Sequence, residues 1–368
     1  MDFLDKVSSS LKSAGNSLKS TAETWAVPVK LQQLYKGYAL KDVSMGETRM
    51  NIDFLSMIAA LADHIYLTGT RSAQSASNSA QAQSLKGQLG VLFQNFYQLS
   101  RFDALTGLAF ETMGPFGAVI ACATSPGSEK MPQDPKSNSR PRYRVFIVFR
   151  GTSAKVGKEI YLDDVSTDLK AGAFKIDNKV GAKAGEVARG FYSTYYSCRN
   201  RVVNQLLPGA YHYLRKIHEE QAKARSPEGL APKTHLHESD IDYYILGHSL
   251  GGAVATLCAY DIACLQPAKH PILVTFGSPP VGNIDFAIDF NRVMVDRVRY
   301  HPRTGEMRSI RVVAQSSAGT LDVVSAVPDK LPNYIHVNTR VLLDTPATNR
   351  LMAHSMTNSY REGLKALK

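Results

Sequence analysis

The stretch ILGHSLGGAV, residues 245–254, places a serine between two glycines at the point where an apolar run ends. The run before the serine, DYYIL (242–246), is short, apolar and aromatic, which is typical of a buried strand. The alanine-rich segment 253–265 that follows favours a helix. A sharp strand-to-helix turn holds a serine hydroxyl at a sheet edge, so the pattern predicts a nucleophile elbow at Ser249.

The glycines and the backbone around this turn have predictable roles. Side chains two positions before and after the serine would collide across the turn, which explains Gly247 and Gly251. The serine needs N–H donors for a developing oxyanion, and the backbone N–H of Leu250 is the first candidate. A second candidate is Thr152, because the buried strand in VFIVFRGTSA (145–154) ends just before it.

A serine nucleophile of this kind calls for an acid and then a histidine, both on loops after later strands. The histidines downstream of Ser249 are His270, His301, His336 and His354. His354 is the one that follows the last predicted strand, whereas His336 lies within that strand. Asp322 follows a strand that ends near residue 315, while Asp261 falls in the helix after the elbow. We therefore expect Ser249 as nucleophile, His354 as general base and acid, and Asp322 as its partner.

Composition limits the class of protein. The 368 residues include 44% hydrophobic and 20% charged residues, which is typical of a globular domain rather than a disordered chain. An excess of 43 Lys and Arg over 32 Asp and Glu gives a net charge of +11, which favours anionic partners. No nucleic-acid motif is present, so we expect no nucleic-acid partner. The arginines between 297 and 311 are interpreted as a solvated strand or hairpin face.

The sequence predicts neither a metal centre nor a cofactor. The four cysteines form no CxxC pair and lie mostly in apolar segments, so they are expected to be buried free thiols. The HLH tripeptide (235–237) lacks a second ligand cluster and is interpreted as solvated histidines.

An N-terminal extension precedes the main domain. Apolar residues recur at helical spacing within residues 3–25, which predicts an amphipathic helix that either packs on the protein or contacts a membrane surface. A second helix is expected at 51–67, followed by a Ser-, Ala- and Gln-rich link at 68–88. We place the domain boundary between residues 90 and 91, giving an extension of 1–90 and a catalytic domain of 91–368. The N-terminus has no ordinary signal peptide, which leaves cytoplasmic residence and another export route open.

The second half of the chain alternates strands with helices. Strands are expected at 116–123, 143–149, 242–246, 271–276, 310–315 and 335–343, with helices near 192–219 and 253–265. Such alternation predicts an α/β fold with a mainly parallel central sheet and helices on both faces.

Five segments within residues 143–360 together resemble the class 3 lipases. These are VFRGTSA with DDVSTDLKA, ARGFYSTYY, ILGHSLGGAVATL, VTFGSPPVGN, and LDVVSAVP with AHSMTNSY. The resemblance implies an α/β-hydrolase fold, hydrolysis of glycerolipid esters without a metal, and a lid helix within 158–174. It places the triad at Ser249, Asp322 and His354 and the oxyanion donors at Thr152 and Leu250, and it makes His248 a structural residue.

The sequence departs from the family at Val165, where tryptophan is usual, and at Arg189, where histidine is usual. The resemblance implies a lipid ester as the substrate, with triacylglycerol and phospholipid both open and the basic charge favouring phospholipid. Two alternatives remain: an esterase for soluble esters, and an effector-type protein that uses the fold to bind a membrane or a partner. The oligomeric state is not predicted.

Overall fold

The computed structural model describes residues 42–68, 87, 97–106, 112–124, 142–151, 173–175, 185–225, 235–296, 298–326, 334–337 and 339–368. Three expected features lie outside these residues: the amphipathic helix of 3–25, most of the link at 68–88, and most of the lid segment at 158–174.

A central sheet organises the described part of the chain. Its seven strands lie in the order β1-β2-β3-β6-β7-β9-β11. Their bounds are β1 Tyr97–Thr106, β2 Thr112–Thr124, β3 Arg142–Phe149, β6 Ile241–His248, β7 Ile272–Phe276, β9 Ser309–Gln315 and β11 Arg340–Asp344. The pairs β1–β2 and β2–β3 are antiparallel, and every neighbouring pair from β3 to β11 is parallel. The expectation of a mainly parallel sheet is confirmed.

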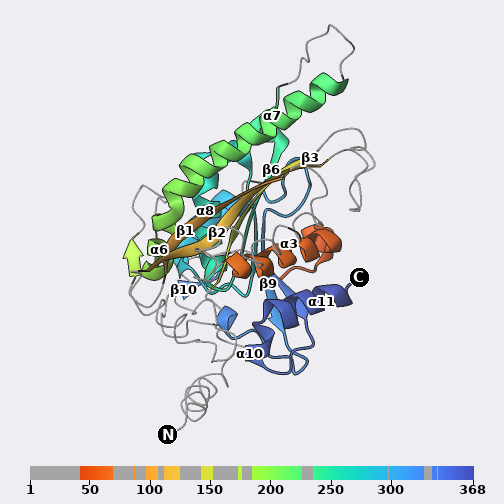
Figure 1. The fold of residues 1–368 in the computed structure, drawn as a ribbon. Helices are drawn as coiled ribbons and strands as arrows, with labels where there is room; N and C mark the ends of the chain where they lie inside the picture. The colour runs from red at the N-terminus through yellow and green to blue at the C-terminus, as the bar shows by residue number, and fades with distance from the viewer. Residues whose placement is uncertain are drawn as a thin grey trace. The chain divides into compact units, whose positions relative to one another are not determined.

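Helices cover both faces of this sheet (Figure 1). One face carries α6 Arg189–Arg199, α7 Leu207–Arg225 and α8 Leu250–Leu265, and the other carries α3 Ile52–His64, α10 Arg350–Ala353 and α11 Arg361–Ala366. Along β3, Phe146 and Val148 belong to the core shared with α3 and α11, while the buried Val145 and Ile147 point to the opposite face. Burial on both faces explains why the central strands are mostly apolar. This arrangement is the α/β-hydrolase fold.

Shorter elements complete the described part of the chain. A second sheet has the order β10-β8-β5-β4, with β10 Tyr334–Ile335, β8 Gly282–Asn283, β5 Glu186–Ala188 and β4 Ala173–Lys175. A π-helical segment, η6 Asn200–Leu206, joins α6 to α7, and α9 Ile284–Asn291 continues into the π-helical η9 Arg292–Asp296. The remaining short helices are η2 Gly46–Thr48, η3 Ile65–Thr68, η7 Glu238–Asp240, η8 Pro267–Lys269, η10 Val324–Ala326 and η11 Met356–Tyr360.

The single strand expected at 335–343 is two strands in different sheets. β10 pairs with β8 in the small sheet, and β11 pairs with β9 in the main sheet. The residues between them make side-chain contacts in place of strand pairing. The His336 ring nitrogen Nε2 lies 2.6 Å from the Ser325 carbonyl, and the Thr339 hydroxyl donates to the Ser309 carbonyl.

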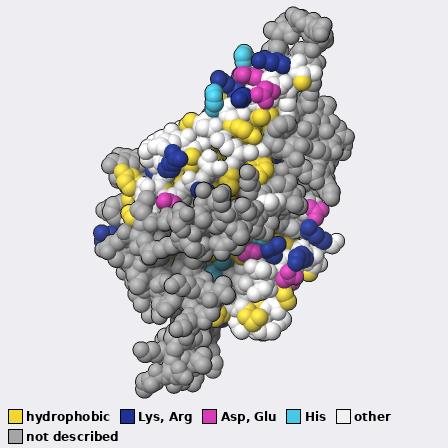
Figure 2. Space-filling model, in the orientation of Figure 1, with side chains coloured by type: hydrophobic (Ala, Val, Ile, Leu, Met, Phe, Trp, Pro, Cys, Tyr) yellow, Lys and Arg dark blue, Asp and Glu magenta, His cyan; other side chains and the backbone are white. Residues whose placement is uncertain are grey.

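Among the described arginines of the 297–311 region, two are buried rather than part of a solvated face. Arg308 and Arg311 are only 3% and 2% exposed, and Arg303 forms an ion pair with the buried Asp242. Arg308 donates to the carbonyls of Pro271 and Val298, so its charge is satisfied inside the fold. On the face drawn in Figure 2, basic and acidic side chains are mixed along α7, where Arg215 pairs with Glu219.

The compact unit that contains the sheet starts before the boundary expected at 90/91. Contacts group residues 42–368 into one compact unit. Within this unit, α3 is part of the main core: Phe54 packs edge-on against Tyr244 of β6, and Leu55 and Ile58 are fully buried. The helix predicted at 51–67 therefore packs as part of the sheet-containing unit rather than as an extension.

Candidate active site

The turn between β6 and α8 places Ser249 at the carboxyl end of a central strand. Ser249 has φ 56° and ψ −130°, a conformation that non-glycine residues rarely adopt and that costs about 1–3 kcal/mol. A Cβ atom on Gly247 would lie 2.1 Å from the Gly251 carbonyl oxygen. One on Gly251 would lie 2.4 Å from the Phe149 carbonyl oxygen. Glycine at both positions therefore lets the elbow close against itself and against the end of β3.

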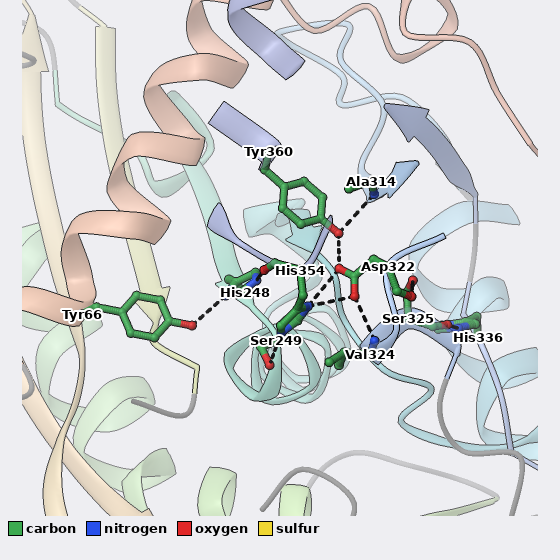
Figure 3. A network of polar contacts seen from close by, with 10 residues as sticks. All are labelled: Tyr66, His248, Ser249, Ala314, Asp322, Val324, Ser325, His336, His354 and Tyr360. Atoms are coloured by element: carbon green, nitrogen blue, oxygen red, sulfur yellow. Dashed lines mark hydrogen bonds and ion pairs between the residues drawn. The ribbon is translucent and has the colours of Figure 1, made fainter. Parts of the chain in front are cut away.

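Three side chains that are far apart in sequence form one hydrogen-bonded chain (Figure 3). The His354 Nε2 atom lies 2.9 Å from the Ser249 hydroxyl oxygen, and His354 Nδ1 lies 2.9 Å from both Asp322 carboxylate oxygens. A carboxylate only accepts hydrogen bonds, so Nδ1 carries the proton and Nε2 is free to accept from the serine. All three residues are buried. This arrangement can activate a serine hydroxyl as a nucleophile.

The backbones of Ser249, Asp322 and His354 are held in place by neighbouring strands and by helix α10. The Ser249 N–H donates to the Phe276 carbonyl at the end of β7, and the Asp322 N–H donates to the Ala314 carbonyl of β9. His354 directly follows α10, which Asn349 caps by accepting from the Met352 N–H. The three functional groups therefore meet beyond the carboxyl ends of the parallel strands, where α/β sheets place their sites.

The Asp322 carboxylate has two further donors. The Val324 N–H donates to Oδ1 at 2.8 Å, and the Tyr360 hydroxyl donates to Oδ2 at 2.6 Å. The Tyr360 hydroxyl in turn accepts from the Ala314 N–H. Burial raises the pKa of Tyr360 well above its usual value, with the Asp322 charge adding to the effect, so the hydroxyl keeps its proton and remains a donor. Tyr360 was not predicted from the sequence, because its link to Asp322 arises only in the folded chain.

His248, beside the serine, also has partners on both ring nitrogens. Its Nε2 lies 2.9 Å from the His354 carbonyl oxygen, and its Nδ1 lies 2.6 Å from the Tyr66 hydroxyl oxygen (Figure 3). Burial lowers the pKa of His248 well below its usual value, and the nearby His354 lowers it further, so the ring is neutral. Tyr66 comes from the segment that the sequence interpretation placed in the N-terminal extension.

Of the two expected oxyanion donors, the structure describes Leu250 but not Thr152. Leu250 is the first residue of α8, so its backbone N–H has no acceptor within the helix and is available at the site. Thr152 lies outside the described residues, but Gly151 before it is buried. Near that strand end, the Arg150 side chain donates to the Pro115 carbonyl at 2.6 Å.

The described ranges hold neither a candidate metal cluster nor a candidate membrane-spanning helix. In the ranges that the structure describes, no group of three or more His, Cys, Asp or Glu side chains could hold a metal ion. Of the helices in those ranges, none has both the length and the apolar character needed to span a membrane.

The fold and this hydrogen-bonded chain define an α/β-hydrolase with a Ser-His-Asp arrangement. The family model of the class 3 lipases matches residues 146–328, about half of the chain. The chain belongs to this family, which confirms the resemblance seen in the sequence.

Individual relatives match over shorter segments. A chloroplastic phospholipase A(1) of Arabidopsis thaliana is 33% identical over 154 residues, which cover 41% of this chain and 30% of that protein. A lipase of Caenorhabditis elegans is 46% identical over 55 residues, 14% of this chain and 16% of that protein. The chain thus spans less than a third of the length of these curated relatives. Among solved structures, the Lip2 lipase from Yarrowia lipolytica is 21% identical with a TM-score of 0.48, over 87% of this chain and 85% of that one.

Proposed function

We propose that this protein hydrolyses carboxylic ester bonds of glycerolipids through an acyl-enzyme formed on Ser249. The observation that carries the proposal is the 2.9 Å contact between the Ser249 hydroxyl and a His354 ring whose other nitrogen is held by Asp322. The family and its phospholipase A(1) and lipase relatives support a lipid ester as the substrate.

In the first half of the reaction, His354 Nε2 takes the proton of the Ser249 hydroxyl as the serine oxygen attacks the ester carbonyl. Asp322 stabilises the resulting imidazolium, and its two other donors, Val324 and Tyr360, keep the carboxylate in place. The oxyanion receives the Leu250 N–H and, in our proposal, donors from Thr152. His354 then gives its proton to the departing alcohol, which leaves an acyl group on the serine.

In the second half, water attacks the acyl carbonyl and His354 Nε2 takes a proton from that water. Collapse of the second tetrahedral intermediate releases the fatty acid, and the proton returns to the Ser249 oxygen. The enzyme is thereby restored, and the net reaction is ester plus water to acid plus alcohol.

Labelling with a fluorophosphonate tests the nucleophile directly. Wild-type protein should be labelled at Ser249, and Ser249→Ala should lose both labelling and about a million-fold of turnover, because the triad acts as a unit. Ser317→Ala is the control, since this exposed serine lies on the turn before Asp322 and should leave both readouts unchanged. If Ser249→Ala lowers turnover by less than tenfold, the nucleophile lies elsewhere.

The choice between neutral and phosphate-bearing glycerolipids needs a second assay. The net charge of +11 favours anionic surfaces, so we propose that phospholipid is the better substrate. Fatty-acid release from phosphatidylglycerol vesicles should exceed release from a triacylglycerol emulsion, with Ser249→Ala as the blank. The opposite order would favour a triacylglycerol lipase, and fast turnover of soluble esters alone would favour an esterase.

A further inference from the structure

Tyr66 reaches the candidate active site from outside the segment that matches the lipase family. It lies in η3, directly after α3, and its hydroxyl oxygen is 2.6 Å from His248 Nδ1 (Figure 3). The family model begins at residue 146, so Tyr66 is supplied by a part of the chain that the match does not include.

The hydrogen bonds of His248 allow only one arrangement of protons. The His354 carbonyl can only accept, so His248 Nε2 must carry the proton that fills their 2.9 Å contact. The ring is neutral because burial lowers the pKa of His248, and Nδ1 is therefore an acceptor. It follows that the Tyr66 hydroxyl donates to Nδ1 and fixes this tautomer.

The same hydroxyl also contacts the strand end that precedes Thr152. The Tyr66 hydroxyl oxygen lies against the Gly151 backbone. A Cβ atom on Gly151 would lie only 2.2 Å from that oxygen, so the approach requires glycine. Burial raises the pKa of Tyr66, which keeps its hydroxyl protonated and able to donate.

We propose that Tyr66 is a positioning residue for ester hydrolysis, joining the backbone beside the proposed oxyanion donor to the backbone of His354 through one tautomer of His248. The inference rests on the proposed function, since it concerns the geometry of that reaction. The donors run in one direction: Tyr66 O–H to His248 Nδ1, and His248 Nε2–H to the His354 carbonyl.

These contacts act on two groups whose placement the reaction needs most: the His354 ring and the backbone before the proposed oxyanion donor. The His354 carbonyl belongs to the residue whose ring must stay within hydrogen-bond distance of Ser249. A displacement of about 1 Å in such a group can lower turnover about 100-fold. Rings that face His248 are those of Tyr66, His354 and Tyr360, with centroids 5.9, 4.5 and 6.0 Å from its own.

Tyr66→Phe removes the hydroxyl and keeps the ring. With a soluble p-nitrophenyl ester, we expect its kcat to fall about tenfold or more while KM stays within twofold, and its fluorophosphonate labelling to slow by the same factor. The matched control is Tyr143→Phe, which breaks another tyrosine–histidine contact, 2.9 Å from Tyr143 to His218 on α7, away from the site. That variant should keep its kcat.

A double-mutant cycle tests whether Tyr66 acts through His248. His248→Gln offers an amide N–H to the His354 carbonyl but lacks the Nδ1 acceptor, so adding Tyr66→Phe to it should change kcat less than twofold. A full additive loss would show that Tyr66 acts by another route and would overturn the inference. Nitrogen-15 spectra of labelled histidine should show the Nε2–H tautomer of His248 in the wild type, and the Nδ1–H tautomer would likewise overturn it.

The outcomes separate the inference from the proposed function. If the wild type is active and labelled but Tyr66→Phe has an unchanged kcat, the positioning role is wrong and the hydrolase function stands. If the wild type shows neither turnover nor labelling, the proposed function is wrong and the inference falls with it.

Discussion

At the scale of single residues, Gly277 shows how closely the backbone approaches the Asp322–His354 pair. It follows β7 with φ 55°. A Cβ atom there would lie 2.5 Å from the Asp322 Oδ2 and 3.0 Å from His354 Nδ1. The carboxylate and the imidazole therefore meet over a stretch of backbone that has no room for a side chain.

Gly277→Ala should consequently damage activity more than stability. The added methyl group must displace Asp322 or His354, so we expect kcat for a soluble ester to fall about 10- to 100-fold. The control is Gly305→Ala, at φ 73° with no atom within 4 Å of the added Cβ. It shares the backbone strain of about 1 kcal/mol, seen as a lower free energy of unfolding, but should keep its kcat. Equal kcat losses in the two variants would contradict this view.

His301 makes stability depend on pH. It is buried, its Nδ1 accepts from the Arg303 and Thr304 N–H groups, and burial with the charge of Arg303 lowers its pKa to about 3. In the unfolded chain, a histidine pKa of about 6.5 lets this residue bind a proton between about pH 3 and 6.5, whereas in the folded chain it stays neutral there. Stability from the neutral ring is thus complete above about pH 6.5 and is lost as the pH falls from there toward 3.

His301→Asn keeps an acceptor for the turn but cannot titrate. Between pH 7 and pH 5 it should lose less unfolding free energy in urea than the wild type, by about 1–2 kcal/mol. The exposed His212, changed to Asn, should leave the wild-type difference unaltered. Parallel curves for wild type and His301→Asn would refute the assignment.

At the scale of elements, the sequence predicts what local patterns encode. The strand, glycines and helix around Ser249 were predicted because burial on both faces makes β6 mostly apolar and the turn excludes side chains. The sequence predicted β10 and β11 as one strand because strands that pair in different sheets can have similar residues, so the sequence alone does not show where one ends and the other begins. Tyr66 and Tyr360 were missed because their partners are 182 and 38 residues away, and such contacts exist only after folding.

The short helix α10 presents apolar side chains next to the site. Leu351 and Met352, 38% and 46% exposed, precede His354 by three and two residues. Apolar side chains at the rim of a lipid-hydrolysing site gain free energy when a lipid surface covers them, about 1 kcal/mol each for partial burial. We therefore expect α10 to contact aggregated substrate.

Changing both residues to serine should lower activity on phosphatidylglycerol vesicles about tenfold or more. Turnover of a soluble ester should stay within twofold, because the triad is untouched. Leu265→Ser is the control, since Leu265 is 48% exposed at the far end of α8 from Ser249 and should change neither activity. Equal losses on both substrates would indicate damage to His354 instead.

At the scale of the whole molecule, segments from near the start and end of the sheet-containing unit pack together on one face of the sheet (Figure 1). Asp63 at the end of α3 accepts from the Thr357 hydroxyl and from Arg361, which both follow His354. Asp53 pairs with Lys368. The contacts hold α3, which leads directly into the short helix of Tyr66, against the segment after His354, although neither lies within the family match at 146–328.

The domain boundary can be tested by truncation, because the packing of α3 argues against a start at residue 91. Four of its side chains, Phe54, Leu55, Ile58 and Leu61, are at most 3% exposed. Burying each stabilises the fold by about 1.5–3 kcal/mol, a sum comparable to the whole stability of a typical domain. A chain that starts at residue 91 should therefore fail to unfold cooperatively and should lack esterase activity.

A chain that starts at residue 42 is the matched comparison, since it retains α3, η3 and the whole compact unit. It should unfold in a single thermal transition and hydrolyse a soluble ester within about threefold of the full chain, because every contact described around Ser249 lies inside it. Cooperative unfolding and activity in the chain that starts at 91 would show that α3 and Tyr66 are dispensable, and would restore the boundary expected from the sequence.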